Sequence, residues 1–178
     1  MLRNPQPALL PGQIERGEID MVLGVERSFG KELVVRHLFK DHFRVAQRKR
    51  HPRGKGAINA EAYCHYGHVV VSAEGGGLPT FIDSSLHNIG MRRHVAVFVQ
   101  HYGLVPPILM QTDYLATLPA RFLAAFSRQL DTFTPPVASS EFRLSAGWHP
   151  RNNSDPAHRW LREQVFAIAE ASDTTAPH

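Results

Sequence analysis

The stretch His68-Val-Val-Val-Ser-Ala-Glu-Gly-Gly-Gly77, followed by Leu-Pro-Thr-Phe-Ile-Asp-Ser-Ser-Leu86, is the most informative part of this sequence. Its run of valines is typical of a strand buried on both faces, and its glycines allow a tight turn. Pro79 stands where a helix can begin. The pattern predicts a strand, a glycine turn and a helix N-terminus, whose backbone N–H groups and dipole favour a carboxylate or phosphate. A simple turn with no ligand is the alternative.

A second strand and turn are predicted over residues 93–103, where Arg-His-Val-Ala-Val-Phe-Val leads into Gln-His-Tyr-Gly. If this strand lies parallel to the first, both turns open at the carboxyl-end edge, where open α/β sheets bind ligands. Gln100, His101 and Tyr102 would stand at that edge. An imidazole and an aromatic ring beside glycine turns can hydrogen-bond to and stack on a planar anionic guest.

Enzyme signatures are weak. The sequence has no nucleophile elbow, no phosphate loop ending in Lys-Ser or Lys-Thr, and no His-Glu-x-x-His. His101 follows a strand, where a general acid or base can stand, but no partner carboxylate is fixed nearby in the sequence. We therefore expect a binding protein and not an enzyme, with no cofactor and no metal.

Composition indicates a globular protein. The chain has 178 residues, of which 43% are hydrophobic and 20% charged, with a formal charge of +4. This length forms one core or two small lobes. The densest basic run, Arg48-Lys-Arg-His-Pro-Arg-Gly-Lys55, has no interleaved aromatics, so a solvated loop is favoured over a nucleic-acid arm.

Cys64 is the single cysteine, which excludes an intrachain disulfide and favours a reducing compartment. His65 and His68 are nearby, but no further ligands follow at a recognised metal spacing, so a small buried thiol is expected. The sequence shows no export signal and no apolar run long enough to span a membrane. We expect a cytoplasmic protein.

Apolar spacing and capping residues predict the remaining elements. Helices are expected over 7–17, from the N-cap Asn59 to Tyr63, over 104–111 from its proline pair onward, over 119–129, and from Asp155-Pro156 onward. Strands are expected over 18–24, 33–39, 42–47, 114–118 and 141–148. The strands 33–39 and 42–47 flank Lys40-Asp41 and predict a hairpin or two adjacent strands. The last helix is expected to bury a stripe formed by Trp160, Leu161, Val165, Phe166 and Ile168.

Two linkers, near residues 51–56 and 132–136, indicate that the chain leaves a first lobe, builds a second and returns. The expected fold is a two-lobed α/β clamp with a ligand cleft between the lobes. Lys40 can supply a counter-charge from the first lobe, although an exposed turn lysine is an equally good interpretation. The strand and helix that normally open such a unit are absent from the start, which predicts a fragment or a truncated reading frame.

Several motifs, in this order and spacing, resemble the regulatory domain of LysR-type transcriptional regulators. They are Gly17-Glu-Ile-Asp-Met-Val-Leu-Gly24, Leu38-Phe-Lys-Asp41, His51-Pro52, Val69-Val-Val-Ser-Ala-Glu-Gly75, Tyr114-Leu-Ala-Thr-Leu-Pro119, Trp148-His149 and Asp155-Pro-x-x-Arg-Trp-Leu-Arg162. The ending is most similar to the subgroup of nodulation regulators and regulators that respond to salicylate or nitroaromatics. The resemblance covers residues 8–169.

The resemblance implies a two-lobed, periplasmic-binding-protein-like (type 2) fold that senses a small effector, usually aromatic or acidic. Lobe I would comprise residues 1–54 and 136–171 and would lack its first strand and helix; lobe II would comprise 55–135, and 172–178 would be a disordered tail. The effector-binding positions carried over are Val25, Phe29, Lys40, Gly75, Gly76, Gln100, His101 and Tyr102.

The resemblance also implies a homodimer or homotetramer. DNA binding would require a helix-turn-helix, which this chain lacks. The main hypothesis is thus an effector-binding module of a transcription factor, without turnover. The alternative is a stand-alone small-molecule binding protein of the same fold. An enzyme using His101 would need a turnover that disappears in His101→Ala.

Overall fold

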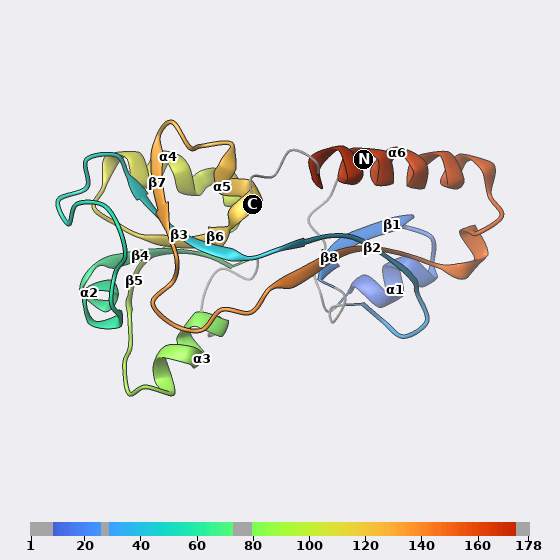
Figure 1. Cartoon of the computed structure of the whole chain (residues 1–178). Coiled ribbons are helices and arrows are strands. Elements are labelled where there is room, and N and C mark those ends of the chain that lie inside the picture. Colours follow the sequence, from blue (N-terminus) through green and yellow to red (C-terminus); the bar gives the residue numbers. More distant parts are fainter. Residues whose placement is uncertain (1–8, 26–28, 73–79, 174–178) are drawn as a thin grey trace. The chain divides into compact units, whose positions relative to one another are not determined.

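The computed structural model describes residues 9–25, 29–72 and 80–173 (Figure 1). The chain divides into two compact units. The first comprises Met1–Asp41 and Phe142–His178, and the second comprises His42–Glu141. The lobe boundaries expected after residues 54 and 135 fall inside the second unit, because the strand that begins at Phe43 pairs with two strands of that unit.

The first unit is built on a three-stranded sheet. Its strands β1 (Met21–Val25), β8 (Phe142–Trp148) and β2 (Val34–Asp41) lie in the order β1-β8-β2, and β8 is antiparallel to both neighbours. The short helix α1 (Leu10–Glu15) and the long helix α6 (Pro156–Asp173) lie on opposite sides of this sheet (Figure 1).

Alternation along the strands explains the two layers. Val22 packs with Leu10 and Ile14 of α1. The opposite face places Trp148 against Phe166 of α6. Successive strand residues point to opposite faces of a sheet, so each helix packs against a separate apolar face.

The second unit has a larger set of strands. β3 (Phe43–Arg48) lies between β6 (Ala116–Pro119) and β7 (Leu130–Phe133), antiparallel to both. β4 (Gly67–Val71) is parallel to β5 (His94–Val99), and a parallel bridge between His68 and Leu115 joins the two groups of strands. The helical elements are α2 (Ala60–His65), α3 (Phe81–His87), the 3-10 turn η2 (Tyr102–Leu104), α4 (Val105–Gln111) and α5 (Ala120–Ala124).

Several local predictions are confirmed. β4 and β5 are parallel neighbours. Asn59 caps α2, and its side chain accepts a hydrogen bond from the backbone N–H of Ala62. Pro106 lies in the first turn of α4. Asp155 caps α6 by accepting a hydrogen bond from the backbone N–H of His158. Local capping chemistry thus places these helix starts correctly.

The predicted pairing of strands 33–39 and 42–47 is wrong. β2 pairs with β8 in the first unit, whereas β3 pairs with β6 and β7 in the second. Lys40 and Asp41 therefore belong to a strand that runs on to the unit boundary, not to a hairpin turn. The helix expected over 119–129 is also shorter than predicted, since α5 ends at Ala124.

The buried face of α6 differs from the predicted stripe. Phe166 is buried as expected, but Trp160, Leu161 and Ile168 are exposed. His158 and Arg162 occupy the buried face instead. Arg162 donates hydrogen bonds to the backbone carbonyls of Asn152 and Asn153 in the turn before α6. The buried guanidinium thus has hydrogen-bond acceptors in this turn, as buried polar groups require.

Candidate functional site

The carboxyl ends of β4 and β5 lie side by side in the second unit. Val71 is opposite Val99, and the backbone N–H of Ser72 donates to the carbonyl of Val99 at 2.8 Å. The chain therefore leaves both strands at one edge. Gly75 and Gly76 lie outside the described residues.

Gln100, His101 and Tyr102 follow β5 directly and are all exposed. His101 has an extended backbone and precedes η2, so the chain turns immediately after the strand. Desolvation raises the pKa of the Tyr102 hydroxyl, although 44% of the residue's surface is exposed. The phenol is therefore neutral near pH 7 and can donate a hydrogen bond.

Sequence reasoning missed an aromatic neighbour of Tyr102. The ring of Phe122 on α5 lies 5.7 Å from the ring of Tyr102, and Phe126 lies 5.2 Å from Phe122. Phe122 lies within the segment 119–129, for which a longer helix is predicted. Its position soon after Pro119, at the end of β6, is the one sequence signal that places it near a strand end. The three rings therefore form a series of neighbouring aromatic side chains that leads from Tyr102 towards the core.

The three remaining candidates belong to the first unit. Val25 pairs with Leu144 of β8, and Lys40 pairs with Arg143, so both lie near one end of the sheet with β8 between them. Phe29 is half-buried against the α1 core. Its ring covers Gly24 and Gly147, where an added Cβ would come within 3.3 and 3.2 Å of the ring. Phe29 therefore has a packing role as well as the predicted effector contact.

A polar network centred on the buried Arg93 lies at the amino end of β5. Arg93 donates from Nε to Oδ1 of Asp83 at 2.7 Å and from Nη2 to Oγ1 of Thr80 at 2.9 Å. Burial opposes ionisation of Asp83, but the hydrogen bonds from Arg93 and Thr80 outweigh it and lower the carboxyl pKa to about 2. This network fixes the start of α3, which follows the glycine segment in the sequence.

His68 is a fully buried histidine on β4. Its Nε2–H donates to the carbonyl of Tyr63 at 2.9 Å, and its ring packs 4.3 Å from the Tyr63 ring. Its Nδ1 has no hydrogen-bond partner among the described residues. Desolvation lowers the pKa of the imidazole to about 4, so His68 is neutral near pH 7. This side chain is a structural part of the strand and not a ligand-binding group.

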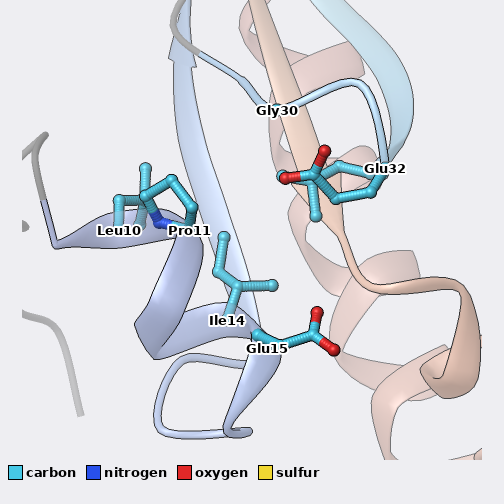
Figure 2. A pocket seen from close by; sticks show the side chains of 7 residues that line it. Leu10, Pro11, Ile14, Glu15, Gly30 and Glu32 are labelled. Carbon is cyan, nitrogen blue, oxygen red and sulfur yellow. The ribbon is translucent and has the colours of Figure 1, made fainter.

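A small pocket in the first unit does not suit an organic anion. It lies between α1 and the segment that leads into β2, and Glu15 and Glu32 border it (Figure 2). Its volume is ≈ 10 Å³, which holds about one water molecule. Two carboxylates beside so small a space disfavour an acidic effector.

Among the residues that the structure describes, no three His, Cys, Asp or Glu side chains form a cluster that could hold a metal ion. Cys64 is half-buried, less enclosed than expected. Desolvation raises the pKa of its thiol, which disfavours the thiolate that a nucleophile or metal ligand requires.

Comparison with known proteins decides the family. The LysR substrate binding domain matches residues 2–168. The chain belongs to this family. A similar curated relative is the HTH-type transcriptional activator NahR of Pseudomonas putida, 31% identical over 87% of this chain and 52% of NahR. Nodulation protein D 3 of Rhizobium leguminosarum bv. phaseoli is 28% identical over 84% of this chain and 50% of that protein. The chain therefore spans about half the length of the curated relatives it matches.

Solved structures agree with this assignment. The probable transcriptional regulator PA0477 from Pseudomonas aeruginosa matches with a TM-score of 0.77 and 27% identity, over 88% of this chain and 52% of that one. The effector-binding domain of QuiR, solved with shikimate, shares the fold with a TM-score of 0.70 at 13% identity, over 94% of this chain and 79% of that one.

The predicted family and the periplasmic-binding-protein-like α/β fold are thus confirmed. The chain is an effector-binding regulatory domain of the LysR type, and this family of regulators is not enzymatic. A small-molecule effector is implied by the family. None of the described helices is long and apolar enough to cross a membrane. The individual effector-binding residues remain predictions.

Proposed function

We propose that this domain senses a small aromatic acid and controls transcription within a longer regulator. The observation that carries the proposal is the pair of parallel strand ends at Val71 and Val99, with Tyr102 exposed directly after one of them. Open α/β sheets bind ligands at such an edge. The family match supplies the effector-binding role, and the geometry supports this place for it.

The chemistry of the edge suits a planar anion. Tyr102 offers a ring face backed by Phe122 and a phenol that can donate a hydrogen bond. His101 adds an imidazole donor. Aromatic stacking together with directed donors recognises an aromatic carboxylate better than an aliphatic or cationic molecule.

The remaining predicted contributors are Gly75 and Gly76 in the glycine segment, Gln100, and the first-unit residues Val25, Phe29 and Lys40. These assignments come from the resemblance to the family. Among them Lys40 is an exposed cation on β2, and its charge would complement a carboxylate.

We also infer that the domain acts in the cytoplasm as a homodimer or homotetramer. DNA binding would be carried by a helix-turn-helix outside this chain. The lobe boundaries of the family, at residues 54/55 and 135/136, stay predictions beside the two units described above.

The test is a thermal-shift screen of the purified chain against benzoates, salicylates, nitroaromatics and flavonoids. A ligand at one hundred times its dissociation constant adds about 2.7 kcal/mol to the free energy of unfolding. We expect a benzoate or salicylate to raise the melting temperature of the native chain but not of Tyr102→Ala.

Met110→Ala is the matched control, because Met110 on α4 is about as exposed as Tyr102 and lies outside the predicted site. The shift should persist in this variant. A well-folded chain that no compound stabilises, or a shift that Tyr102→Ala leaves intact, would overturn the proposal.

A further inference from the structure

The basic run that follows β3 folds into a braced loop over residues 48–56, called the basic loop below. Gln47 is fully buried, and its Nε2 donates to the carbonyl of Gly54 at 2.7 Å. The ring of His51 is buried, with Nε2 3.1 Å from the carbonyl of Asp113. Arg48 donates from Nη1 to the carbonyls of the next two residues, at 3.1 and 2.6 Å. The loop therefore presents its cations on a held backbone and not on a freely solvated turn.

The cations of this region divide into paired and unpaired groups. Arg48 pairs with Asp113 at 2.7 Å, and Lys49 pairs with Asp131 at 2.6 Å. Three further cations are exposed and form no ion pair with a described residue: Arg50, Lys55 and Arg128. The paired side chains help to hold the loop, and the unpaired ones are available to a partner.

Arg128 belongs to the same surface although it is far away in the sequence. The backbone N–H of Lys49 donates to the carbonyl of Gln129 at 3.1 Å, which continues the antiparallel pairing of β3 with β7 by one step. Arg50 and Arg128 are the next residues on the two chains. Two unpaired guanidinium groups thus lie at the same end of the β3–β7 pair, where a bound anion would relieve their repulsion.

The excess positive charge of the whole chain is concentrated here. Six cations outnumber by four the two carboxylates that pair with them, Asp113 and Asp131: Arg48, Lys49, Arg50, Arg53, Lys55 and Arg128. The chain has 20 Lys and Arg against 16 Asp and Glu, also a difference of four. The other 14 cations and 14 anions therefore balance. Such a local excess attracts anions at long range.

The backbone of Arg50 gives a second indication. Its φ is 56°, and among the described residues it is the only one other than glycine with a positive φ. Glycine and asparagine adopt this conformation more readily than arginine does. An arginine kept at such a position points to a use for its side chain.

We propose that the basic loop and Arg128 form a contact surface for the phosphate backbone of duplex DNA. Guanidinium groups bind phosphate oxygens in pairs, and backbone contacts require no apolar surface. An acidic protein partner normally needs an aromatic or aliphatic anchor. No exposed large hydrophobic residue of the described chain lies in 48–56 or 127–131. The loop also has no Phe, Tyr or Trp on which single-stranded bases could stack.

This inference rests on the proposed function, because the longer regulator would hold the domain close to DNA. A contact that is weak in isolation then becomes effective through the high local concentration of its partner. Phosphate contacts carry no sequence information, so the surface would add affinity but no base preference.

Fluorescence anisotropy of the purified 178-residue chain with a labelled duplex of arbitrary sequence tests the surface. Three unpaired cations predict a slope of about −2.7 for the logarithm of the association constant against that of the salt concentration, at about −0.9 per phosphate. Arg50→Asn, Lys55→Gln and Arg128→Gln should each weaken binding roughly tenfold at about 50 mM salt and reduce the slope by about one.

Arg159→Gln is the matched control, because Arg159 is an exposed cation of the first unit and the net charge changes equally. This variant should bind the duplex as the native chain does. Arg50→Asn should also melt no lower than the native chain, since asparagine suits its backbone. A loss of binding in this variant therefore reports the side chain and not the fold.

Three results would overturn the contact surface: no binding by up to about 1 mM protein at low salt, an equal loss in Arg159→Gln and Arg50→Asn, or tighter binding of single strands or polyglutamate than of the duplex. The salicylate thermal shift should be unchanged in all these variants. A chain that responds to salicylate but does not bind the duplex would contradict only the basic loop, and the reverse result would contradict only effector sensing.

Discussion

The Nε of Arg93 lies 2.7 Å from the Oδ1 of Asp83, and the Arg93 side chain is only 3% exposed. The same guanidinium reaches Oγ1 of Thr80 and lies 3.5 Å from the hydroxyl of Tyr63. The pair therefore connects the start of α3, the approach to β5 and the helix α2. Arg93 directly precedes β5, at the end of that strand opposite to Val99, where the effector site is assigned.

Removing Arg93 should destabilise the domain. Arg93→Met leaves the Asp83 carboxylate with Thr80 alone, and breaking a buried pair in this way costs about 3 kcal/mol. Urea denaturation monitored by circular dichroism measures the change in the free energy of unfolding. Arg16→Met removes an ion pair with Glu18 that is exposed, so this control should show no measurable change. Equal stability of Arg93→Met and the native chain would contradict a structural role for the network.

Acidification should destabilise the domain through His68. The pKa of this imidazole is about 4 in the fold and about 6.5 when exposed, so the unfolded chain binds the extra proton first. The stabilisation by neutral His68 is full above pH 6.5 and is lost as the pH falls towards 4, by roughly 3 kcal/mol in total. Protonation would leave a second N–H donor in the core.

Urea midpoints of the native chain and His68→Gln between pH 7 and 4 check this prediction. The urea midpoint of the variant should change less with pH than that of the native chain. Burial also lowers the pKa of His51, so this residue should account for part of the remaining pH dependence. Asp83 titrates in a lower window, from about pH 4 down to its folded pKa of about 2. If the urea midpoint changed with pH equally in the native chain and the variant above pH 4, the assignment of this pH dependence to His68 would be contradicted.

Phe122→Ala should weaken effector binding without removing it. The ring of Phe122 supports Tyr102 at 5.7 Å, and such aromatic pairs contribute about 0.5–1.5 kcal/mol, or roughly two- to tenfold in affinity. Isothermal titration with the ligand found in the screen measures the dissociation constant. Phe122→Tyr keeps a ring at this position and should bind nearly as well as the native chain. A loss of affinity as complete as that of Tyr102→Ala would instead place Phe122 itself on the effector.

Arg162→Met should loosen the connection between β8 and α6. Arg162 donates to the carbonyls of Asn152 and Asn153 and to Nδ1 of the buried His158, so its removal takes a charged donor away from three acceptors. We expect a loss of about 2–3 kcal/mol in the free energy of unfolding. Hydrogen exchange should report faster exchange in residues 150–160 than in β4 and β5. Uniform acceleration across both units would contradict a local role.

Sequence predicted those parts of the fold that short-range chemistry determines. The valines of β4 and β5 indicate buried parallel strands, and Asn59 and Asp155 mark helix starts through their side-chain caps. These features depend on neighbours within a few residues. The order of motifs along the chain then identified the family, which composition alone did not.

Long-range partners were not predictable in this way. Residues 33–47 alternate as two strands, but nothing in their pattern shows that β8 pairs with the first and β6 and β7 with the second. Apolar spacing assigned Trp160 and Ile168 to the core because it could not show that Arg162 reaches two backbone carbonyls. The Arg93–Asp83 pair was also missed, although Thr80 and Asp83 have the three-residue spacing of a capping box.

The most direct test of the account is a nuclear magnetic resonance titration of the isotopically labelled 20.0 kDa chain with salicylate, following backbone amide shifts. We predict saturable shift changes at Gln100, His101 and Tyr102, with none on α6 beyond those that any added salt produces. Saturable changes confined to residues away from the ends of β4 and β5 would contradict the assignment of the effector site.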